Sequence, residues 1–218
     1  MKIAIDGPAG AGKSTLARRL AQKLGYIYID TGAMYRAVTW KALQKNIDFT
    51  DEKAICKLVE ETKIHFEYNS QTQKVICDKQ EITKQIRSPE VSAVVSQIAA
   101  FPSVREKMVQ QQQELSKDSD VVMDGRDIGE VVLPDADFKF YITADIDERA
   151  RRRIDELKNE GYDISFNTIK NDLKDRDLKD TQRPVGALKI LDNSLVIDTT
   201  DLTIEEVLAK MLAIIQGE

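Results

Sequence analysis

The sequence has few of the residues that build metal centres and disulfide frameworks. Its 218 residues include two cysteines, Cys56 and Cys77, and a single histidine, His65, which lies between them. Metal sites of the zinc type draw their ligands from closely spaced pairs of such residues, and these two cysteines form no close pair. A metal site built from these cysteines and the histidine is therefore not expected, and the sequence predicts two free, buried thiols in a reducing compartment.

Long apolar runs and an excess of basic residues are also missing. No apolar stretch approaches the roughly 18 residues of a membrane-spanning helix, and no signal-like apolar segment follows Met1. The formal net charge is −5, whereas proteins that bind nucleic acid or anionic membranes generally present a positive surface. We therefore expect a cytoplasmic protein with no nucleic-acid or membrane partner, in which any bound phosphate meets locally gathered positive charge.

The order of the apolar segments indicates an α/β fold. Short apolar runs with the length of buried strands alternate with longer segments that have helical spacing. This alternation is the signature of βαβ units, so the sequence predicts a five-stranded parallel sheet flanked by helices. The strands are expected at residues 2–6, 26–29, 121–123, 138–142 and 195–197.

Helices are expected between these strands and at the end of the chain. One segment breaks the rhythm, because residues 64–68 and 74–77 alternate between apolar and polar side chains around a turn at Asn69 and Ser70. Such alternation predicts a small antiparallel β insert. The helices are predicted at residues 14–24, 31–44, 51–62, 146–160, 165–180 and 203–215, and over 89–117 with an interruption near Phe101 and Pro102.

The loop after the first strand carries a phosphate-binding motif. Residues 7–14 (GPAGAGKS) match G-x-x-x-x-G-K-S/T in full, with a predicted strand before them and a predicted helix after them. In such a loop backbone N–H groups converge on phosphate oxygens at the positive end of the helix. Lys13 would reach the β and γ phosphates and the Ser14 hydroxyl would hold Mg²⁺. The alternative is a glycine turn that only joins strand to helix.

The sequence lacks the features of two other classes of nucleotide-binding protein. It contains no Asn-Lys-x-Asp, the motif with which GTPases read guanine. Motor and transporter ATPases usually end a strand in an acid pair that polarises water, whereas here the strand at 121–123 leads into Asp124, Gly125, Arg126 and Asp127. Arginine at that position favours an anion. We therefore expect the acceptor of the phosphoryl group to be a phosphate itself.

Five motifs follow one another along the chain: residues 7–14 (GPAGAGKS), 30–36 (DTGAMYR), 96–102 (SQIAAFP), 124–127 (DGRD) and 176–180 (RDLKD). In this order they resemble the bacterial cytidylate kinases, which are P-loop nucleoside monophosphate kinases. The resemblance covers essentially the whole chain, including residues 64–86. One departure is Lys179, which stands where relatives often carry arginine.

The resemblance implies one P-loop nucleoside monophosphate kinase domain over residues 1–218, with an acceptor-side insert at about 41–95 and a short lid at about 149–183. It implies transfer of the γ-phosphoryl group of ATP to CMP or dCMP, giving ADP and CDP or dCDP, with Mg²⁺ as the cofactor. ATP and CMP would then be the partners of a monomer. The ATP-binding residues carried over are Gly7, Pro8, Ala9, Gly10, Ala11, Gly12, Lys13, Ser14 and Thr15.

The resemblance also implies roles for residues outside the loop. Thr31, Arg36 and Arg126 would surround the acceptor phosphate, while Ser96, Arg105 and Asp127 would read the cytosine. Arg176, Asp180 and Arg183 would meet the sugar and phosphate, and the helix from Ile146 would bring Arg149, Arg152 and Arg153 over ATP. The implied catalytic residues are Lys13, Arg126, Arg149, Arg153, Arg176 and Arg183.

These residue types suit the implied chemistry. An acceptor phosphate is already an anion, so it needs no general base, which agrees with a chain that has a single histidine. Catalysis then depends on positioning and on neutralising the charge of the transferred group. The 4-amino group of cytosine is a donor, for which the carboxylate of Asp127 is a natural acceptor, whereas uracil presents a carbonyl oxygen there.

Simpler structural roles remain open for several of these side chains. Arg149, Arg152 and Arg153 could form a solvated helix face, supported by pairs between Arg152 and the glutamates at 148 and 156. Arg176 and Asp180 could be a surface ion pair. Thr31 could cap the helix at 31–44, and Asp124 could be a capping residue or lie close to Mg²⁺.

Two other functions remain open as well. Another P-loop small-molecule kinase, for shikimate or AMP, would carry the same loop; a shikimate kinase would not need Asp127 to read a base, and an AMP kinase would need an adenine pocket. A regulatory module that uses ATP as a switch could dispense with the arginines on both the acceptor side and the lid.

Overall fold

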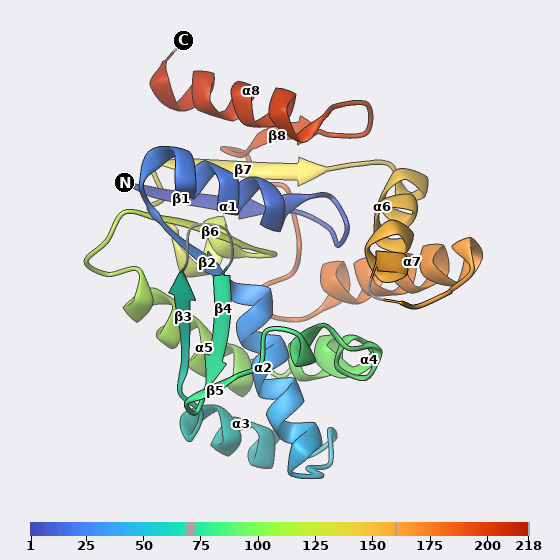
Figure 1. Cartoon of the computed structure of the whole chain (residues 1–218). Helices are drawn as coiled ribbons and strands as arrows, with labels where there is room; N and C mark the ends of the chain where they lie inside the picture. Colours follow the sequence, from blue (N-terminus) through green and yellow to red (C-terminus); the bar gives the residue numbers. More distant parts are fainter. Residues whose placement is uncertain (69–72, 160, 218) are drawn as a thin grey trace. The chain divides into compact units, whose positions relative to one another are not determined.

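The computed structural model describes residues 1–68, 73–159 and 161–217, which form two compact units (Figure 1). The first, here called the P-loop unit, comprises Met1–Tyr28 and Asp118–Glu218. The second, here called the central unit, comprises Ile29–Lys117. The turn predicted at Asn69 and Ser70, and the predicted helix end at Glu160, lie outside the described residues.

The P-loop unit is built around a five-stranded sheet with the order β2-β6-β1-β7-β8. Strand β1 is parallel to β6 and to β7, and β8 is parallel to β7, so the predicted parallel sheet is confirmed. Strand β2 belongs partly to the central unit. The strands are β1 (Lys2–Asp6), β2 (Ile27–Asp30), β6 (Val121–Gly125), β7 (Phe138–Thr143) and β8 (Leu195–Asp198).

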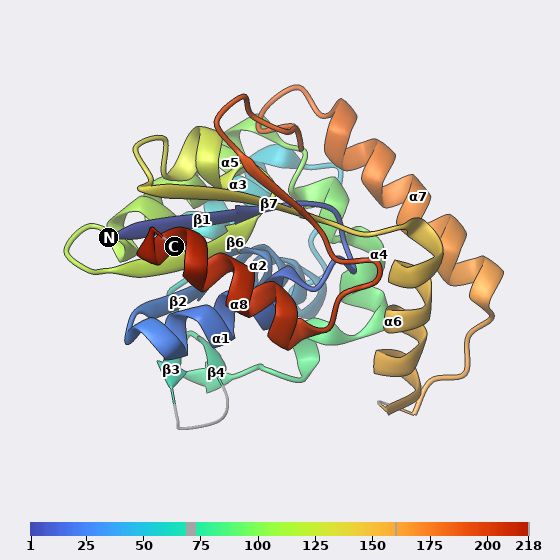
Figure 2. The same ribbon diagram turned by 90° about the horizontal axis from the view of Figure 1, so that it is seen from above.

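The helices of this unit are α1 (Lys13–Leu24), α6 (Ile146–Asn159), α7 (Phe166–Gln182) and α8 (Ile204–Gln216). Helix α1 packs against β6 and α8, and both helices lie along one face of the sheet (Figure 2). The second pair, α6 and α7, pack on each other beyond the end of β7 (Figures 1 and 2). Each helix is within two residues of its predicted bounds at both ends.

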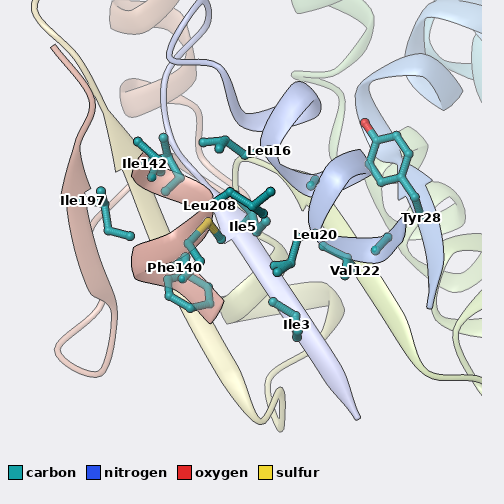
Figure 3. Close-up of a cluster of buried hydrophobic side chains, with 14 of the residues drawn as sticks. Ile3, Ile5, Leu16, Leu20, Tyr28, Val122, Phe140, Ile142, Ile197 and Leu208 are labelled. Carbon is teal, nitrogen blue, oxygen red and sulfur yellow. The ribbon is translucent and has the colours of Figure 1, made fainter. Parts of the chain in front are cut away.

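The core of the P-loop unit follows from the apolar periodicities of the sequence. Leu16 and Leu20, one helical turn apart on α1, are fully buried against Ile3 and Ile5, alternate residues of β1 that point to the same face (Figure 3). Burial of a Leu or Ile side chain contributes roughly 1.5–3 kcal/mol, so this layer anchors the loop between β1 and α1.

The central unit contains a three-stranded antiparallel sheet in the order β3-β4-β5, which confirms the predicted insert. Its strands are β3 (Ile64–Tyr68), β4 (Gln73–Cys77) and β5 (Gln80–Glu81). A short 3₁₀ turn follows at Gln85–Arg87. The helices α2 (Thr31–Gln44), α3 (Glu52–Glu60), α4 (Pro89–Ile98) and α5 (Pro102–Leu115) pack in the pairs α2–α4 and α3–α5. The interruption at Phe101 and Pro102 is confirmed.

Some local predictions were wrong. Asp30, not Thr31, caps α2, because its carboxylate accepts the N–H of Ala33 at 2.8 Å while Thr31 already has helical geometry. Both cysteines are free, but only Cys77 is buried and Cys56 is half-buried. A single turn of wide, π-type helix at Ile128–Val132 was not predicted. Within the described ranges, no helix is long and apolar enough to cross a lipid bilayer.

Candidate active site

Glycine geometry shapes the loop between β1 and α1. Gly7 has a φ of 145°, and a Cβ at this position would overlap the backbone carbonyl oxygen of Ile142 on β7. Gly12 has a φ of 89° and occupies the N-cap of α1, where it offers no side chain to cap the helix. The N–H groups of the first turn of α1 therefore face the loop, the arrangement that binds phosphate at a helix N-terminus.

Lys13, the first residue of α1, is only 5% exposed. Its Nζ donates a hydrogen bond to the carbonyl oxygen of Pro8 at 2.7 Å. Burial and, to a smaller extent, the positive charge of Arg126 lower the pKa of Lys13 to about 7, against the opposing effect of Asp124. A phosphate group beside Nζ would stabilise the ammonium form, because an opposite charge favours the charged state. Lys13 is thus a buried amine whose positive charge a phosphate at the loop would stabilise.

Ser14 and Asp124 form a pair of oxygen donors next to this lysine. The hydroxyl of Ser14 donates to Oδ2 of Asp124 at 2.8 Å, and the hydroxyl of Tyr28 donates to Oδ1 at 2.8 Å. Asp124 is 3% exposed near the end of β6, in register with Ile5 of β1. It receives side-chain donors and heads no helix, so the capping hypothesis for Asp124 is wrong. Oxygen donors of this kind suit a hard cation such as Mg²⁺.

Within the part of the chain that the structure describes, no group of three or more His, Cys, Asp or Glu side chains could hold a metal ion by itself. A Mg²⁺ ion in a nucleotide site commonly has one or two protein ligands, with water and phosphate oxygens as the others. The pair of Ser14 and Asp124 fits that pattern.

A buried network of arginine and carboxylate groups lies on the same unit. Nε of Arg126 donates to Oδ2 of Asp180 at 2.6 Å, and its Nη1 donates to the carbonyl oxygen of Gly125 at 3.2 Å. Nη1 of Arg183 lies 3.8 Å from the other oxygen of Asp180. Burial alone would raise the pKa of Asp180, but the nearby guanidinium groups of Arg126, Arg176 and Arg183 hold it below its ordinary value.

This network corrects one alternative drawn from the sequence. Asp180 is only 5% exposed, so a surface ion pair with Arg176 is wrong. Helix α7 ends at Gln182, and Arg183 has extended geometry before Pro184. Arg183 nevertheless reaches Asp180, and its side chain is 6% exposed.

Asp127 follows Arg126 directly and is 6% exposed. It is the residue before the π-type turn at Ile128–Val132, and its backbone carbonyl accepts the N–H of Val131 at 2.8 Å. The structure therefore holds the backbone of Asp127 on both sides, by β6 before it and by the turn after it.

The arginines of α6 have three different environments. Arg149 is 7% exposed and donates to the carbonyl oxygens of Ala144 and of Ala9 in the phosphate loop, at 3.0 and 3.1 Å, and to Asp177 on α7 at 2.6 Å. The solvated-face hypothesis is therefore wrong for Arg149. Arg152 pairs with Glu148 at 3.0 Å as expected and also donates to the carbonyl oxygen of Thr199 at 2.7 Å.

Arg153 has the more open position on the same helix. Its guanidinium lies 2.9 Å from Glu156, so the structure pairs Glu156 with Arg153, whereas the sequence suggested Arg152 as its partner. The side chain of Arg153 is 24% exposed. The two lid arginines predicted to be catalytic thus differ in burial and in partners.

The central unit carries the remaining predicted residues. Thr31 is 4% exposed at the start of α2, and Arg36 is half-buried one turn further on. Ser96 is half-buried on α4, a helix that packs against α2. Arg105 on α5 is 2% exposed; it donates to the carbonyl oxygen of Ala99 at 3.2 Å, and its guanidinium carbon lies 5.6 Å from the ring centre of Tyr35.

Comparison with known proteins identifies the family to which the chain is similar. A family profile described as "Cytidylate kinase" matches residues 3–217. The chain belongs to the cytidylate kinase family. A cytidylate kinase from Caldicellulosiruptor saccharolyticus is 48% identical over 212 residues, which cover 97% of this chain and 94% of the relative. A cytidylate kinase from Lactobacillus johnsonii is 48% identical over 216 residues, covering 99% and 94% of the two chains.

Among solved structures, that of an uncharacterized protein from Eubacterium ventriosum matches with a TM-score of 0.53 at 14% identity and covers 100% of this chain and 99% of that one. This likeness concerns the fold alone. The resemblance to the cytidylate kinase family that the five motifs indicated is confirmed by the profile and the relatives.

Sequence reasoning missed three residues in this member of the cytidylate kinase family. Tyr28 and Asp6 stand at or near the ends of strands that border the loop, and Asp177 lies inside the RDLKD motif without an assigned role. A signal for Asp6 was present, because an acid directly before a phosphate loop ends a buried strand. No local pattern pointed to the hydroxyl of Tyr28 as a partner of Asp124.

Proposed function

We propose that the protein transfers the γ-phosphoryl group of ATP to CMP or dCMP, giving ADP and CDP or dCDP. The observation that supports this most is the position of a buried arginine–carboxylate network beside a complete phosphate loop. Arg149 links the two, because it donates to the carbonyl oxygen of Ala9 in the loop at 3.1 Å and to Asp177, on the helix that carries Asp180, at 2.6 Å. Membership of the cytidylate kinase family supports the choice of acceptor.

In the proposed reaction an oxygen of the acceptor phosphate attacks the γ-phosphorus of ATP. The bond from this phosphorus to the bridging oxygen breaks, and its electron pair stays on the ADP that leaves. The attacking oxygen is already anionic, so no general base is required. Lys13, Arg126 and Arg149 neutralise charge on the transferred group, the type of catalysis on which phosphoryl transfer chiefly depends. Arg153, Arg176 and Arg183 complete the proposed set of catalytic residues.

Mg²⁺ is the proposed cofactor, with Ser14 as its protein ligand and Asp124 beside it. The hydroxyl–carboxylate distance of 2.8 Å supports this assignment, since both oxygens border the loop at Lys13. When bound, Mg²⁺ would neutralise charge on the β and γ phosphates. Asp124 orients Ser14, and Tyr28 orients Asp124 in turn. Removal of Tyr28's hydroxyl would therefore loosen the metal ligand without removing it.

The acceptor is proposed to be bound by three groups of residues, as the family pattern implies. The phosphate is met by Thr31, Arg36 and Arg126, the cytosine by Ser96, Arg105 and Asp127, and the sugar and phosphate by Arg176, Asp180 and Arg183. Arg126 and Asp127 are neighbours with different tasks in this proposal. Arg126, which Asp180 holds in place, serves the phosphate, and Asp127 serves the base.

The proposal extends to the localisation, oligomeric state and partners of the enzyme. We propose a cytoplasmic monomer that binds ATP and CMP but neither nucleic acid nor membranes, and the net charge of −5 supports the exclusion of polyanions. The proposed insert at about 41–95 contains α3, the strands β3–β5 and most of α4, and the proposed lid at about 149–183 contains most of α6 and all of α7. Light scattering of the purified protein with and without substrates tests the monomer.

Release of ADP, measured by a coupled assay with Mg²⁺ and ATP, tests the activity. CMP, dCMP, UMP, AMP and shikimate are compared as acceptors, and a reaction without acceptor measures ATP hydrolysis. We expect CMP or dCMP to have the highest kcat/KM. Faster turnover of AMP or shikimate would support another P-loop small-molecule kinase, and ATP binding without transfer to any acceptor would support a regulatory module.

A further inference from the structure

Asp6 is a buried carboxylate for which the proposed reaction has no use. It is the last residue of β1, directly before Gly7 of the phosphate loop, and is 7% exposed. Its Oδ1 accepts the backbone N–H of Ile128 at 2.8 Å and its Oδ2 accepts the N–H of Gly129 at 2.8 Å. Both acceptor atoms are thus engaged by two successive N–H groups of a segment more than a hundred residues further along the chain.

These two bonds act on the segment that carries Asp127. The N–H groups belong to the first two residues of the π-type turn at Ile128–Val132, which begins directly after Asp127. A turn of this kind is rare, and such turns occur frequently at functional sites. Asp127 is joined directly to Ile128, so the two bonds to Asp6 fix the backbone immediately after Asp127.

Burying the charged carboxylate of Asp6 costs free energy that a neutral side chain in its place would not. Burial, with a smaller contribution from the charge of Asp127, raises the pKa of Asp6 to about 6, although the two backbone N–H donors and Lys13 oppose the rise. An asparagine would be neutral, but in the same orientation its NH₂ group would replace one of the two carboxylate oxygens and face one of the two N–H donors. The carboxylate is therefore suited to holding both N–H groups at once.

We propose that Asp6 is a positioning residue for acceptor recognition: by accepting the N–H groups of Ile128 and Gly129, it fixes the turn from which Asp127 reads the base of CMP. The inference rests on the proposed function. Asp6 also couples that turn to the phosphate loop, because Asp6 and Gly7 are adjacent in the chain. It acts on the substrate only through Asp127.

The test compares kcat/KM for CMP and UMP in the wild-type protein, Asp6→Asn, Asp127→Asn and the double variant. The Asp6→Asn protein keeps the volume of the side chain and removes a buried charge, so we expect it to fold. Loss of one hydrogen bond should lower the CMP-to-UMP ratio by about threefold to tenfold, less than the full base contact, while the KM for ATP stays within about twofold. In the Asp127→Asn background, Asp6→Asn should change the ratio no further.

Asp198→Asn is the matched control. Asp198 ends β8 and likewise accepts a backbone N–H, that of Thr200 at 2.9 Å, but on a segment remote from Asp127 in the chain. This variant should leave the ratio unchanged. Amide hydrogen exchange measures the two bonds directly and needs no substrate. The amides of Ile128 and Gly129 should exchange faster in Asp6→Asn than in the wild-type protein.

The outcomes separate the two proposals. Wild-type protein that transfers no phosphoryl group to CMP would overturn the proposed function and this inference with it. With an active wild type, an unchanged ratio in Asp6→Asn, unchanged exchange at Ile128 and Gly129, or ratio effects that multiply in the double variant would overturn the inference alone. If Asp6→Asn fails to fold, Asp6→Ser, which is smaller and keeps one acceptor, is measured in its place with the same criteria.

Discussion

The phosphate loop and the segment at 124–129 both follow strands of one sheet, but they are held by different means. The loop is shaped largely by its own backbone, because Gly7 and Gly12 adopt positive φ and Lys13 donates to the carbonyl of Pro8 only five residues before it. The distant side chains of Arg149 and Thr199 add hydrogen bonds to the carbonyl oxygens of Ala9 and Ala11. The segment at 124–129 is held in position by side chains that are distant in the sequence. Ser14 and Tyr28 hold Asp124, Asp180 holds Arg126, and Asp6 holds the turn after Asp127.

This difference has a consequence for substitutions. A binding loop whose conformation depends largely on its own backbone should tolerate most substitutions elsewhere in the protein. A segment that is oriented by remote side chains should lose function when any one of those side chains is replaced. The donor side of the proposed reaction is therefore expected to depend on few residues and the acceptor side on many.

The largest effect is expected at the lysine of the phosphate loop. Lys13→Ala should lower kcat by about a thousandfold or more while the melting temperature changes little, because Lys13 neutralises phosphate charge and adds no apolar packing. Lys23→Ala, at an exposed basic site in the last turn of the same helix, is the control. Turnover of Lys13→Ala within about tenfold of wild type would remove Lys13 from the proposed catalytic set.

A smaller effect should separate two arginines of α6. Arg149→Ala should lower kcat by about tenfold to a hundredfold with little change in the KM for CMP, because Arg149 contacts the phosphate loop at Ala9. Arg153→Ala should lower kcat less, since Arg153 is more exposed and pairs with Glu156. Steady-state kinetics at saturating ATP measures both. Equal losses in kcat and in CMP affinity for Arg149→Ala would place it on the acceptor side.

The smallest effect concerns stability rather than turnover. The folded-state pKa of Asp6, about 6, exceeds its ordinary value of 3.8, so the folded protein holds this proton more tightly. Its stabilising contribution is present below the ordinary value and is lost as pH rises through about 6. Relative to wild type, Asp6→Asn should therefore gain on the order of 1–3 kcal/mol in the free energy of unfolding between about pH 4 and pH 7.

Urea unfolding of both proteins across that pH range measures the difference in their free energies of unfolding. Only the change of this difference with pH is informative, because the lost hydrogen bond shifts it by the same amount at every pH. The charges that act on Asp6 from neighbouring elements are Asp127 and Lys13, so the same series in Asp127→Asn checks whether that carboxylate contributes to the slope. A difference that is flat across the range would show that Asp6 has no raised pKa.

Local pattern was sufficient for most of the fold and for the phosphate loop. The spacing of Leu16 and Leu20, the stop at Gly25 and the interruption at Pro102 each act within a few residues, so the element bounds could be predicted. The glycines and Lys13 likewise form a contiguous motif. Thr31 shows the limit of such reasoning, since two adjacent residues could both cap α2 and only the backbone geometry assigns that role to Asp30.

The partners of the residues outside the phosphate loop could not be predicted because they depend on the fold in three dimensions. Nothing in the sequence near Arg126 indicates Asp180, and a run of charged residues on α6 gives no sign that Arg149 is buried against the phosphate loop. The position of Asp6 directly before the phosphate loop was visible in the sequence, but its partners were not, because the two donors are backbone N–H groups of a distant turn.

The central claim is that Arg126 serves the phosphate and Asp127 reads the base, and it is tested most directly by kcat/KM for CMP and UMP in Arg126→Ala and Asp127→Asn. Asp127→Asn should lower the CMP-to-UMP ratio by about tenfold to a hundredfold, because an amide can donate to the uracil carbonyl that a carboxylate repels. Arg126→Ala should lower both values together and leave the ratio unchanged. An unchanged ratio in Asp127→Asn, or a ratio that falls in Arg126→Ala instead, would contradict the account.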